Sequence, residues 1–392
     1  MTKYLRMVKY IDMKINEVVE AIQQERAFYF YRGRVALYAL LKAMGVKEGD
    51  EVILQAFTCL AVPNPILWLK AVPVYVDIDP NTFNMDVDKL EEKITERTKV
   101  IIVQHTYGIP TDMEKVLDIA QKYNLYVIED SCHTLSSKYM GRLVGLFGDA
   151  SFYSFEWGKP VIIGLGGCAV VNNTDIQRKV EDIYPDFVLP SRRETLMVHI
   201  EYILHYLLVN PTTFWTMRRI YRMLYKSGIL VGTFKKEEYK GIETGDRNKR
   251  MSEFHKNLLI KKLKNWDKEE EHRIWVANKY EEFLRTTSIT RPILDKNYEP
   301  VYLRYPILAK NKDKVLEEAQ KRKIELGDWY ISPVHPLTGE DLEFVKYKQG
   351  ECPVAEEICR KVITLPIHRK INDKEVKRIT EFLQEMEARN LC

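Results

Sequence analysis

The sequence lacks the features that mark membrane-spanning, nucleic-acid-binding and low-complexity proteins. No apolar run reaches the roughly 18 to 20 uninterrupted residues that a membrane-spanning helix needs. The 60 Lys and Arg and the 56 Asp and Glu residues are interspersed and leave a net charge of +4, so nothing indicates a nucleic-acid-binding surface. No internal repeat or biased tract is evident. These absences leave a globular chain long enough for a large core and a smaller unit.

Cysteine and histidine are scarce and show none of the spacings that bind a metal ion, so we expect no metal site. None of the eight histidines forms an H-x-x-x-H pair. Residues 1–10 are charged and lack the apolar core of a secretion signal, so we expect a cytoplasmic protein with reduced thiols. The six cysteines are Cys59, Cys132, Cys168, Cys352, Cys359 and Cys392.

Short apolar runs alternate with charged stretches of helical period from residue 51 to about residue 173. The runs cover residues 52–54, 74–76, 100–103 and 126–128. This alternation predicts an α/β fold in which helices cover both faces of a parallel sheet. Ligands of such sheets collect at the carboxyl ends of the strands, which is where the sequence places Thr58, His105, Asp130 and Ser154.

The pattern changes in the last third of the chain. A long polar helix from about residue 270, a strand-like run at 300–306 and an amphipathic helix near 374–387 predict a small α+β domain over 266–392. The large domain then takes residues 1–175 and part of 176–265.

The stretch 176–244 is predicted to be a helical insertion in the large domain. It contains apolar and aromatic runs at 200–209 and 214–226. The second run mixes aromatic residues with Arg and Lys as an interfacial helix does, so contact of 200–226 with a membrane surface is one interpretation. A helical hairpin packed on the core or across the dimer is the favoured interpretation.

An acidic strand end and a lysine-containing segment form the pattern that carries chemistry. The strand end, 127–130, contains Asp130, and the segment 154–159 with the glycine-rich turn 164–167 follows about two dozen residues later. An aspartate, a hydroxyl, a lysine and a small-residue loop are the groups that hold pyridoxal phosphate. Asp130 is the candidate for keeping the pyridine nitrogen protonated, Lys159 for the covalent bond and proton transfers, and Ser154 for the phosphate.

Each of these residues also has a plainer interpretation. Most of the 60 basic residues must lie on the solvated surface, and an acidic strand end often caps the next helix. The turn 164–167 can serve a simple hairpin. Lys159 stands out because it follows the apolar run 150–155, which reads as a buried strand. The ordered set is therefore more informative than any of its members.

The order of motifs resembles the DegT/DnrJ/StrS family of pyridoxal-phosphate-dependent sugar aminotransferases, which build amino sugars on nucleotide carriers. The resemblance implies the aspartate-aminotransferase-like fold, known as fold type I, with a mostly parallel central sheet in the large domain and a small C-terminal α+β domain. The matching segments are 33–37, 49–59, 73–77, 105–108, 112–113, 129–133, 154–159, 248–252, 353–356 and 365–368.

The resemblance also implies roles around the cofactor ring. It assigns Lys159 the covalent bond to the aldehyde, Asp130 the pyridine nitrogen, and His133 a hydrogen bond near the ring hydroxyl. Cys59 stands where many relatives carry an aromatic residue that stacks on the ring. A cysteine packs as a small apolar group and offers no aromatic face, so ring stacking is an open question.

At the phosphate, the resemblance implies a site shared between two subunits. Ser154 and the backbone amides of Arg34 and Val35 would hold the phosphate, and Asn248 would reach across from a neighbouring subunit. The Arg34 side chain, at a place where small or hydroxyl residues are commoner, could add a cation. A shared site implies a homodimer.

The function implied by the resemblance is transfer of an amino group from an amino acid, with glutamate as the expected donor, to a keto sugar carried on a nucleotide. Such a reaction belongs to amino-sugar or surface-polysaccharide biosynthesis. Lys159 favours aminotransfer, because family members that dehydrate sugars carry a histidine in its place. Two alternatives stay open: a cofactor-binding regulator without turnover, and a related enzyme such as a sugar dehydratase or a cyclitol aminotransferase.

Overall fold

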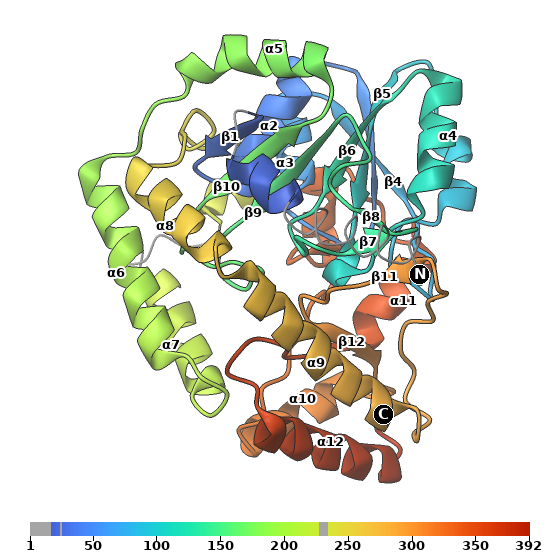
Figure 1. Cartoon of the computed structure of the whole chain (residues 1–392). Coiled ribbons are helices and arrows are strands. Elements are labelled where there is room, and N and C mark those ends of the chain that lie inside the picture. Colours follow the sequence, from blue (N-terminus) through green and yellow to red (C-terminus); the bar gives the residue numbers. More distant parts are fainter. Residues whose placement is uncertain (1–16, 24–25, 227–233) are drawn as a thin grey trace, which may run out of the picture.

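A central sheet organises the computed structural model, which describes residues 17–23, 26–226 and 234–392 (Figure 1). The strand β10 (Gly167–Val171) runs antiparallel to both of its neighbours, and the other pairs in the sheet are parallel. Within the described residues the sheet has seven strands, in the order β1 (Ala27–Phe30), β10 (Gly167–Val171), β9 (Ala150–Ser154), β6 (Tyr126–Asp130), β5 (Thr98–Gln104), β2 (Glu51–Gln55) and β4 (Val72–Val76).

The mostly parallel sheet confirms the predicted α/β fold class. The four apolar runs fall within β2, β4, β5 and β6. Successive residues of a strand face opposite sides, so Val52 and Leu54 pack in the core beside α2 (Gly33–Ala43) while Ile53 packs in the core beside α4 (Met113–Tyr123). Because both faces are covered, β2 is buried at every position, and this explains why its apolar residues are continuous.

Helices lie on both faces of the sheet (Figure 1). α2 packs against α3 (Pro63–Trp68) and α5 (Thr174–Ile183) on one face, and α4 lies on the other. Local sequence sets the helix ends. The Asp112 side chain accepts the N–H of Lys115 at the start of α4, and Asn124 ends that helix in the left-handed conformation.

The remaining large-domain elements are short and connect these layers. The strands are β3 (Thr58–Cys59), β7 (Lys138–Tyr139) and β8 (Arg142–Leu143). The 3-10 helices are η1 (Val87–Lys89), η2 (Glu91–Lys93), η3 (Thr106–Gly108), η4 (Tyr184–Asp186) and η5 (Lys236–Lys240).

A helical hairpin follows η4 and runs down one side of the molecule (Figure 1). It consists of α6 (Arg192–Leu208) and α7 (Phe214–Lys226), within the stretch 176–244. Ser191 and Glu194 form a capping box that starts α6. The outer side of α6 exposes Leu196, Ile200 and Leu207. Among the described residues, no helix combines the length and apolar character needed to cross a membrane.

The C-terminal elements enclose a core of their own. It includes Val276, Ile307, Ile363 and Leu383, all essentially buried. This separate core supports the proposed small domain, whose bounds at 266–392 stay a prediction. The elements that contribute to this core are α9 (Trp266–Leu284), β12 (Tyr305–Leu308), α10 (Lys312–Lys321), β14 (Val362–Leu365) and α12 (Asp373–Ala388). The other elements of the last third are α8 (Glu253–Leu263), β11 (Tyr298–Glu299), β13 (Val334–His335), η6 (Gly339–Val345) and α11 (Pro353–Lys361).

The strand expected at 300–306 is wrong over most of its length, because β12 begins only at Tyr305. The N–H of Leu303 donates to the carbonyl of Tyr107, a residue of η3, at 2.7 Å. Arg273 donates to the carbonyl of Leu303 at 3.2 Å. These backbone groups are therefore bonded to other elements and do not form a strand ladder, which an apolar pattern cannot reveal.

Gly167 lets β10 pass close to the start of α2. A Cβ on Gly167 would lie 2.3 Å from the carbonyl carbon and oxygen of Arg32 and 2.4 Å from the nitrogen of Gly33. Backbone atoms cannot yield as a flexible side chain does, so only glycine fits between this strand and the helix start.

We expect Gly167→Ala to lower the free energy of unfolding by about 1–3 kcal/mol, because the added methyl group overpacks against backbone. Urea unfolding followed by circular dichroism measures the loss. Gly245→Ala is the matched control, because its added Cβ meets nothing within 4 Å. Equal stability of the two variants would contradict the close approach.

Candidate active site

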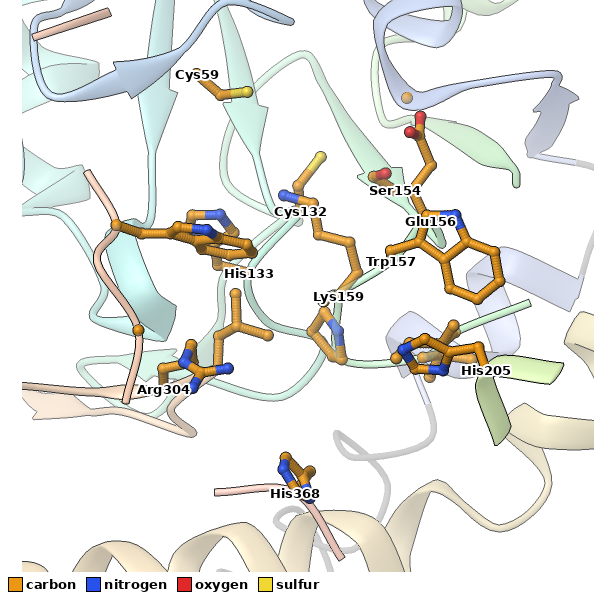
Figure 2. A pocket seen from close by; sticks show the side chains of 18 of the residues that line it. Cys59, Cys132, His133, Ser154, Glu156, Trp157, Lys159, His205, Arg304 and His368 are labelled. Carbon is orange, nitrogen blue, oxygen red and sulfur yellow. The ribbon is translucent and has the colours of Figure 1, made fainter. Parts of the chain in front are cut away.

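A cavity of about 1260 Å³ opens at the carboxyl ends of β6 and β9. Figure 2 shows Lys159 near its centre, with side chains from both domains around it. The structure brings most of the predicted site residues into its lining: Arg34, Cys59, Asp130, His133, Ser154 and Lys159. Val35 and Asn248 do not line it.

The end of β6 separates two neighbouring carboxylates. Glu129 and Asp130 face opposite sides of the sheet because they are successive strand residues. Asp130 lines the cavity. Glu129 is fully buried on the other side. Of the two, only Asp130 can reach a ligand.

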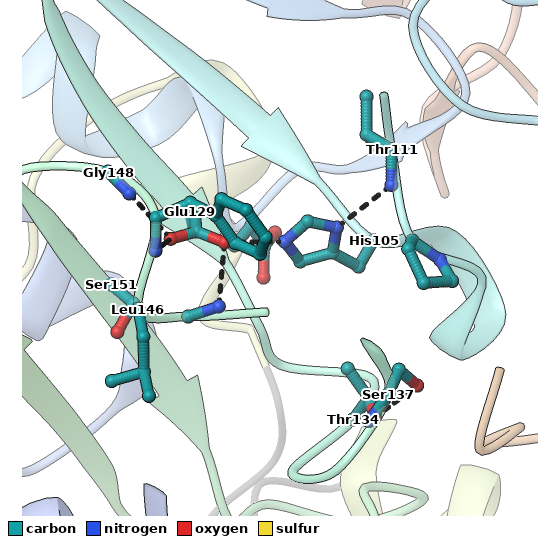
Figure 3. A network of polar contacts seen from close by, with 12 residues as sticks. His105, Thr111, Glu129, Thr134, Ser137, Leu146, Gly148 and Ser151 are labelled. Atoms are coloured by element: carbon teal, nitrogen blue, oxygen red, sulfur yellow. Dashed lines mark hydrogen bonds and ion pairs between the residues drawn. The ribbon is translucent and has the colours of Figure 1, made fainter. Parts of the chain in front are cut away.

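Glu129 is saturated with hydrogen bonds, as Figure 3 shows. One oxygen accepts the N–H of Gly145 at 2.6 Å and lies 3.1 Å from His105 Nε2. The other accepts the N–H groups of Phe147 and Gly148 at 2.7 and 2.8 Å. His105 Nδ1 accepts the N–H of Thr111, so Nε2 carries the proton and donates to Glu129. This set of bonds gives Glu129 a structural role.

Asp130 has a carboxylate suited to a cationic ring nitrogen. One oxygen accepts the N–H of Cys132 at 3.0 Å. Burial raises the pKa of Asp130, and the nearby Lys159 charge and the hydrogen bonds from Cys132 oppose that rise. A protonated ring nitrogen facing the carboxylate would favour its ionised form in the same way.

Lys159 lies in the loop that follows β9. Gly158 turns that loop with a φ of +74°, and a Cβ there would lie 2.8 Å from the Trp329 ring. Among the described residues, the Lys159 amine has no hydrogen-bond or ion-pair partner. An amine without a partner in a cavity is the arrangement that covalent chemistry at nitrogen requires.

His133 is a neutral hydrogen-bond donor. Its Nδ1 accepts the N–H of Tyr107 at 3.1 Å, so Nε2 carries the proton. Tyr330 places its hydroxyl 3.4 Å from that Nε2. Burial, with help from the charge of Lys159, holds the pKa of His133 well below its usual range. The ring can therefore donate to an oxygen in the cavity without carrying a charge.

The start of α2 and the end of β9 form an anion-binding corner. A Cβ on Gly33 would lie 3.0 Å from Ser154 Cβ and 3.4 Å from its Oγ, so the helix start and the hydroxyl are close. The Ser154 hydroxyl has no hydrogen-bond partner in the described part of the chain. A free hydroxyl at a helix N-terminus fits a phosphate.

Arg34 and Val35 contribute less to this corner than their sequence position suggests. The Val35 N–H donates to the Arg32 carbonyl at 3.1 Å. The Arg34 guanidinium pairs with Glu238 and lies 3.8 Å from Glu156, so carboxylates already neutralise it. The backbone N–H of Arg34 remains a candidate phosphate donor, and the use of the Val35 amide stays a prediction.

Asn248 and Cys59 keep open the questions that the sequence raised. The Asn248 carbonyl accepts the N–H of Val188 at 2.8 Å, away from the cavity of its own chain. The backbone of Cys59 in β3 pairs with that of His335 in β13. Burial raises the pKa of the Cys59 thiol. A cross-subunit role for Asn248 stays a prediction.

The α6–α7 hairpin forms a wall of the cavity that sequence reasoning missed. His205 of α6 packs on Trp157 with ring centroids 4.7 Å apart and planes 36° apart. Burial, aided by the charge of Lys370, lowers the pKa of His205 to about 4. The aromatic residues of 200–226 were the available signal for this wall. Apolar rings on both sides of a helical hairpin indicate that the hairpin packs against more than one surface. The hairpin residues in the lining are Tyr202, His205, Tyr206, Val209, Phe214, Arg218 and Tyr221.

The C-terminal domain supplies a second wall, built on the buried carboxylate of Glu325. Its two oxygens lie 3.1 Å from Arg304 Nη2 and 3.0 Å from His368 Nε2. All three residues line the cavity. Burial alone would raise the pKa of Glu325, but His368 and Arg304 outweigh it and hold that pKa at about 2. The motif at 365–368 pointed to His368, whereas nothing in the sequence singled out Arg304 or Glu325.

Comparison with known proteins places the chain in one family over most of its length. The model of the DegT/DnrJ/EryC1/StrS aminotransferase family matches residues 15–384. An uncharacterised protein of Methanocaldococcus jannaschii is 30% identical over 362 residues, which cover 90% of this chain and 84% of that protein. GDP-perosamine synthase of Escherichia coli O157:H7 is 39% identical over 193 residues, about half of each chain (49% and 51%). In fold, the aminotransferase from Psychrobacter cryohalolentis superimposes with a TM-score of 0.74 at 20% identity, over 96% of this chain and 90% of that one.

The low pKa of Glu325 predicts how its contribution to stability depends on pH. A depressed carboxyl pKa stabilises the fold above the unfolded value of about 4.5, and that stability is lost as the pH falls toward about 2. We expect Glu325→Gln to lower the free energy of unfolding at pH 7 by up to about 3 kcal/mol. The difference from the unmodified protein should shrink in urea titrations below pH 4.5.

Glu317 provides the matched control. Its pKa is also about 2, set by Lys321 and Lys314, but it lies on the exposed face of α10. Solvent screens such pairs, so Glu317→Gln should have a much smaller effect at pH 7. A pH-independent loss in Glu325→Gln would show that its ionisation does not stabilise the fold.

Proposed function

Because the chain belongs to the DegT/DnrJ/EryC1/StrS aminotransferase family, whose members use pyridoxal phosphate, we propose that it transfers an amino group from glutamate to the keto carbon of a nucleotide-linked sugar. The chain is a pyridoxal-phosphate-dependent aminotransferase. The glutamate donor and the identity of the sugar and its nucleotide belong to the proposal. The observation that carries it is the meeting of Lys159, Asp130 and Ser154 at one cavity.

Lys159 is the proposed catalytic residue. Pyridoxal phosphate, when bound, supplies the electron sink that amine chemistry needs. Lys159 would hold its aldehyde covalently, release it to the incoming amino group, and then move a proton between carbon and nitrogen. The absence of an ion-pair partner for the Lys159 amine among the described residues supports this role, because no other group holds the amine away from a bound aldehyde.

Asp130, His133 and Ser154 are the proposed binding residues. Asp130 would face the pyridine nitrogen and keep it protonated. His133 would donate from Nε2 to the ring hydroxyl, consistent with its neutral state. Ser154 would donate to the phosphate together with the backbone N–H groups at the start of α2. Without an aromatic residue at Cys59, one face of the ring would depend on packing by a small thiol.

We further propose a homodimer with a shared site. Asn248 lies outside the cavity of its own chain, which supports a role in the partner's site. The reaction is proposed to be cytoplasmic, in keeping with six cysteines that form no disulfide. The wall formed by α6 and α7 would then border the space open to the sugar and its nucleotide.

We expect Lys159→Ala to abolish the absorbance that the lysine-bound cofactor shows and to reduce turnover by at least about a thousandfold. The absorbance spectrum before and after addition of glutamate measures both effects. Lys179→Ala, on the exposed surface of α5, is the control and should keep the spectrum. Normal bleaching by glutamate in Lys159→Ala would refute the assignment.

We expect Asp130→Asn to slow the half-reaction with glutamate by about a hundredfold, because the neutral amide no longer stabilises a protonated ring nitrogen. Stopped-flow absorbance in a single turnover measures the rate. Asp118→Asn, on the exposed surface of α4, serves as the control. An unaltered single-turnover rate would remove Asp130 from this role.

A shared site predicts complementation between two variants of low activity. Lys159→Ala and Asn248→Ala subunits, each weakly active alone, should recover up to about a quarter of full activity when mixed and allowed to exchange, because one site in the mixed dimer carries neither change. Activity per site, measured with sedimentation to fix the oligomeric state, provides the readout. No recovery in a proven mixed dimer would place Asn248 outside the partner's site.

A further inference from the structure

Arg304 and His368 form a polar wall that the proposed chemistry does not use. In Figure 2 they lie on the opposite side of Lys159 from Ser154. A buried carboxylate, Glu325, holds both of them, with one oxygen for each. Burying a carboxylate is costly unless it is paired, so a carboxylate that fixes two cavity-lining side chains marks a built site.

The guanidinium of Arg304 is held in a defined plane. Its Nε donates to Thr364 Oγ1 at 3.1 Å, and its Nη2 donates to Glu325 Oε1 at 3.1 Å. Gly327 leaves room for the group, since a Cβ there would lie 3.0 Å from Arg304 Nε and 2.2 Å from Thr364 Oγ1. The side chain therefore packs against the Gly327–Thr364 backbone bridge in one orientation.

Part of this guanidinium remains available to a ligand. A guanidinium has five N–H donors, and the two bonds above use one on Nε and one on Nη2. Among the described residues, Nη1 has no hydrogen-bond partner. The side chain keeps 14% of its surface exposed, on a residue that lines the cavity.

The charge of the cluster formed by Arg304, His368 and Glu325 suits a single carboxylate better than a diphosphate. His368 Nδ1 accepts the N–H of Lys370, and its Nε2–H donates to Glu325, a pattern that the neutral ring satisfies. The cation of Arg304 is offset by the carboxylate of Glu325, so this pair has no net charge. A multiply charged anion would meet the field of Glu325, whereas one carboxylate can take the remaining N–H groups in a planar arrangement.

We propose that Arg304 binds the carboxylate of a substrate and thereby orients that substrate toward Lys159. Resting on the proposed function, that carboxylate is the α-carboxylate of the amino-acid donor. A carboxylate on the acceptor sugar has the same chemistry and is the other source to be tested. Glu325 is a positioning residue, because it acts on the ligand through Arg304.

Two small amines separate carboxylate recognition from reactivity. Aminooxyacetate and methoxyamine both react covalently with the bound cofactor, and only the first carries a carboxylate. In the cofactor-loaded Arg304→Gln variant, the rate constant for aminooxyacetate should fall about 10- to 100-fold, as expected for loss of a charge-assisted pair. The rate constant for methoxyamine should change less than about twofold, because no carboxylate contact is lost.

Three variants keep the test specific. Arg304→Lys retains a charge without the planar fork and should give an intermediate loss. Arg291→Gln removes an arginine that pairs with Glu281 outside the cavity, and it should leave both rate constants unchanged. Thermal melting of each variant checks that the fold is intact. An equal fall for both amines in a folded Arg304→Gln protein, or no fall for either, would overturn the proposal.

Glutamate then identifies the source of the carboxylate. We expect the apparent KM for glutamate in the bleaching half-reaction to rise about 10- to 100-fold in Arg304→Gln, with a smaller change in the limiting rate. An unchanged KM for glutamate would overturn the assignment to the donor and point to a carboxylate on the acceptor. A wild-type protein that reacts with aminooxyacetate and ignores every amino donor would contradict the proposed function while leaving the role of Arg304 testable.

Discussion

The fully buried carboxylate of Glu129 fixes the end of β6, and the cavity depends on that anchor. Four donors meet its two oxygens: His105 and three backbone N–H groups of residues 145–148. A buried charge without these partners would be strongly destabilising. Because strand residues alternate, fixing Glu129 on one face of the sheet fixes Asp130 on the other.

The same anchor sets the position of neighbouring loops. His105 follows β5, so its bond to Glu129 ties the ends of two adjacent parallel strands together. The loop 145–148 leads into β9, which ends at Ser154 and precedes Lys159. Asp130 is thus next to the anchored residue in β6. Ser154 and Lys159 follow the loop 145–148, which is bonded to the same buried carboxylate. Rigid support of this kind is what a site needs to hold a cofactor in one orientation.

The parts of the structure governed by local pattern could be predicted from the sequence. Apolar runs gave the strands β2, β4, β5 and β6, and the pattern placed Asp130 and Ser154 at strand ends, where the structure has them. Lys159, which the ordered motifs singled out, lines the same cavity. The run 300–306 misled, because its backbone bonds to elements far away in the chain. The pairing of Glu325 with Arg304 could not be predicted from the sequence. The two residues lie 21 positions apart, and such a contact leaves no periodic pattern of apolar residues. The α6–α7 hairpin did have a signal in its aromatic residues, but that signal does not say which surface the rings contact.

The arginines that line the cavity around Lys159 are paired with carboxylates. Arg34 is paired with Glu238, Arg218 with Asp328, and Arg273 with Glu269. Each of these arginines has a carboxylate in the chain, whereas the Lys159 amine has none among the described residues. An ion pair or hydrogen bond would occupy the Lys159 amine and hinder bond formation at its nitrogen. The paired arginines therefore line the walls of the cavity, and this difference in pairing is consistent with the role proposed for Lys159.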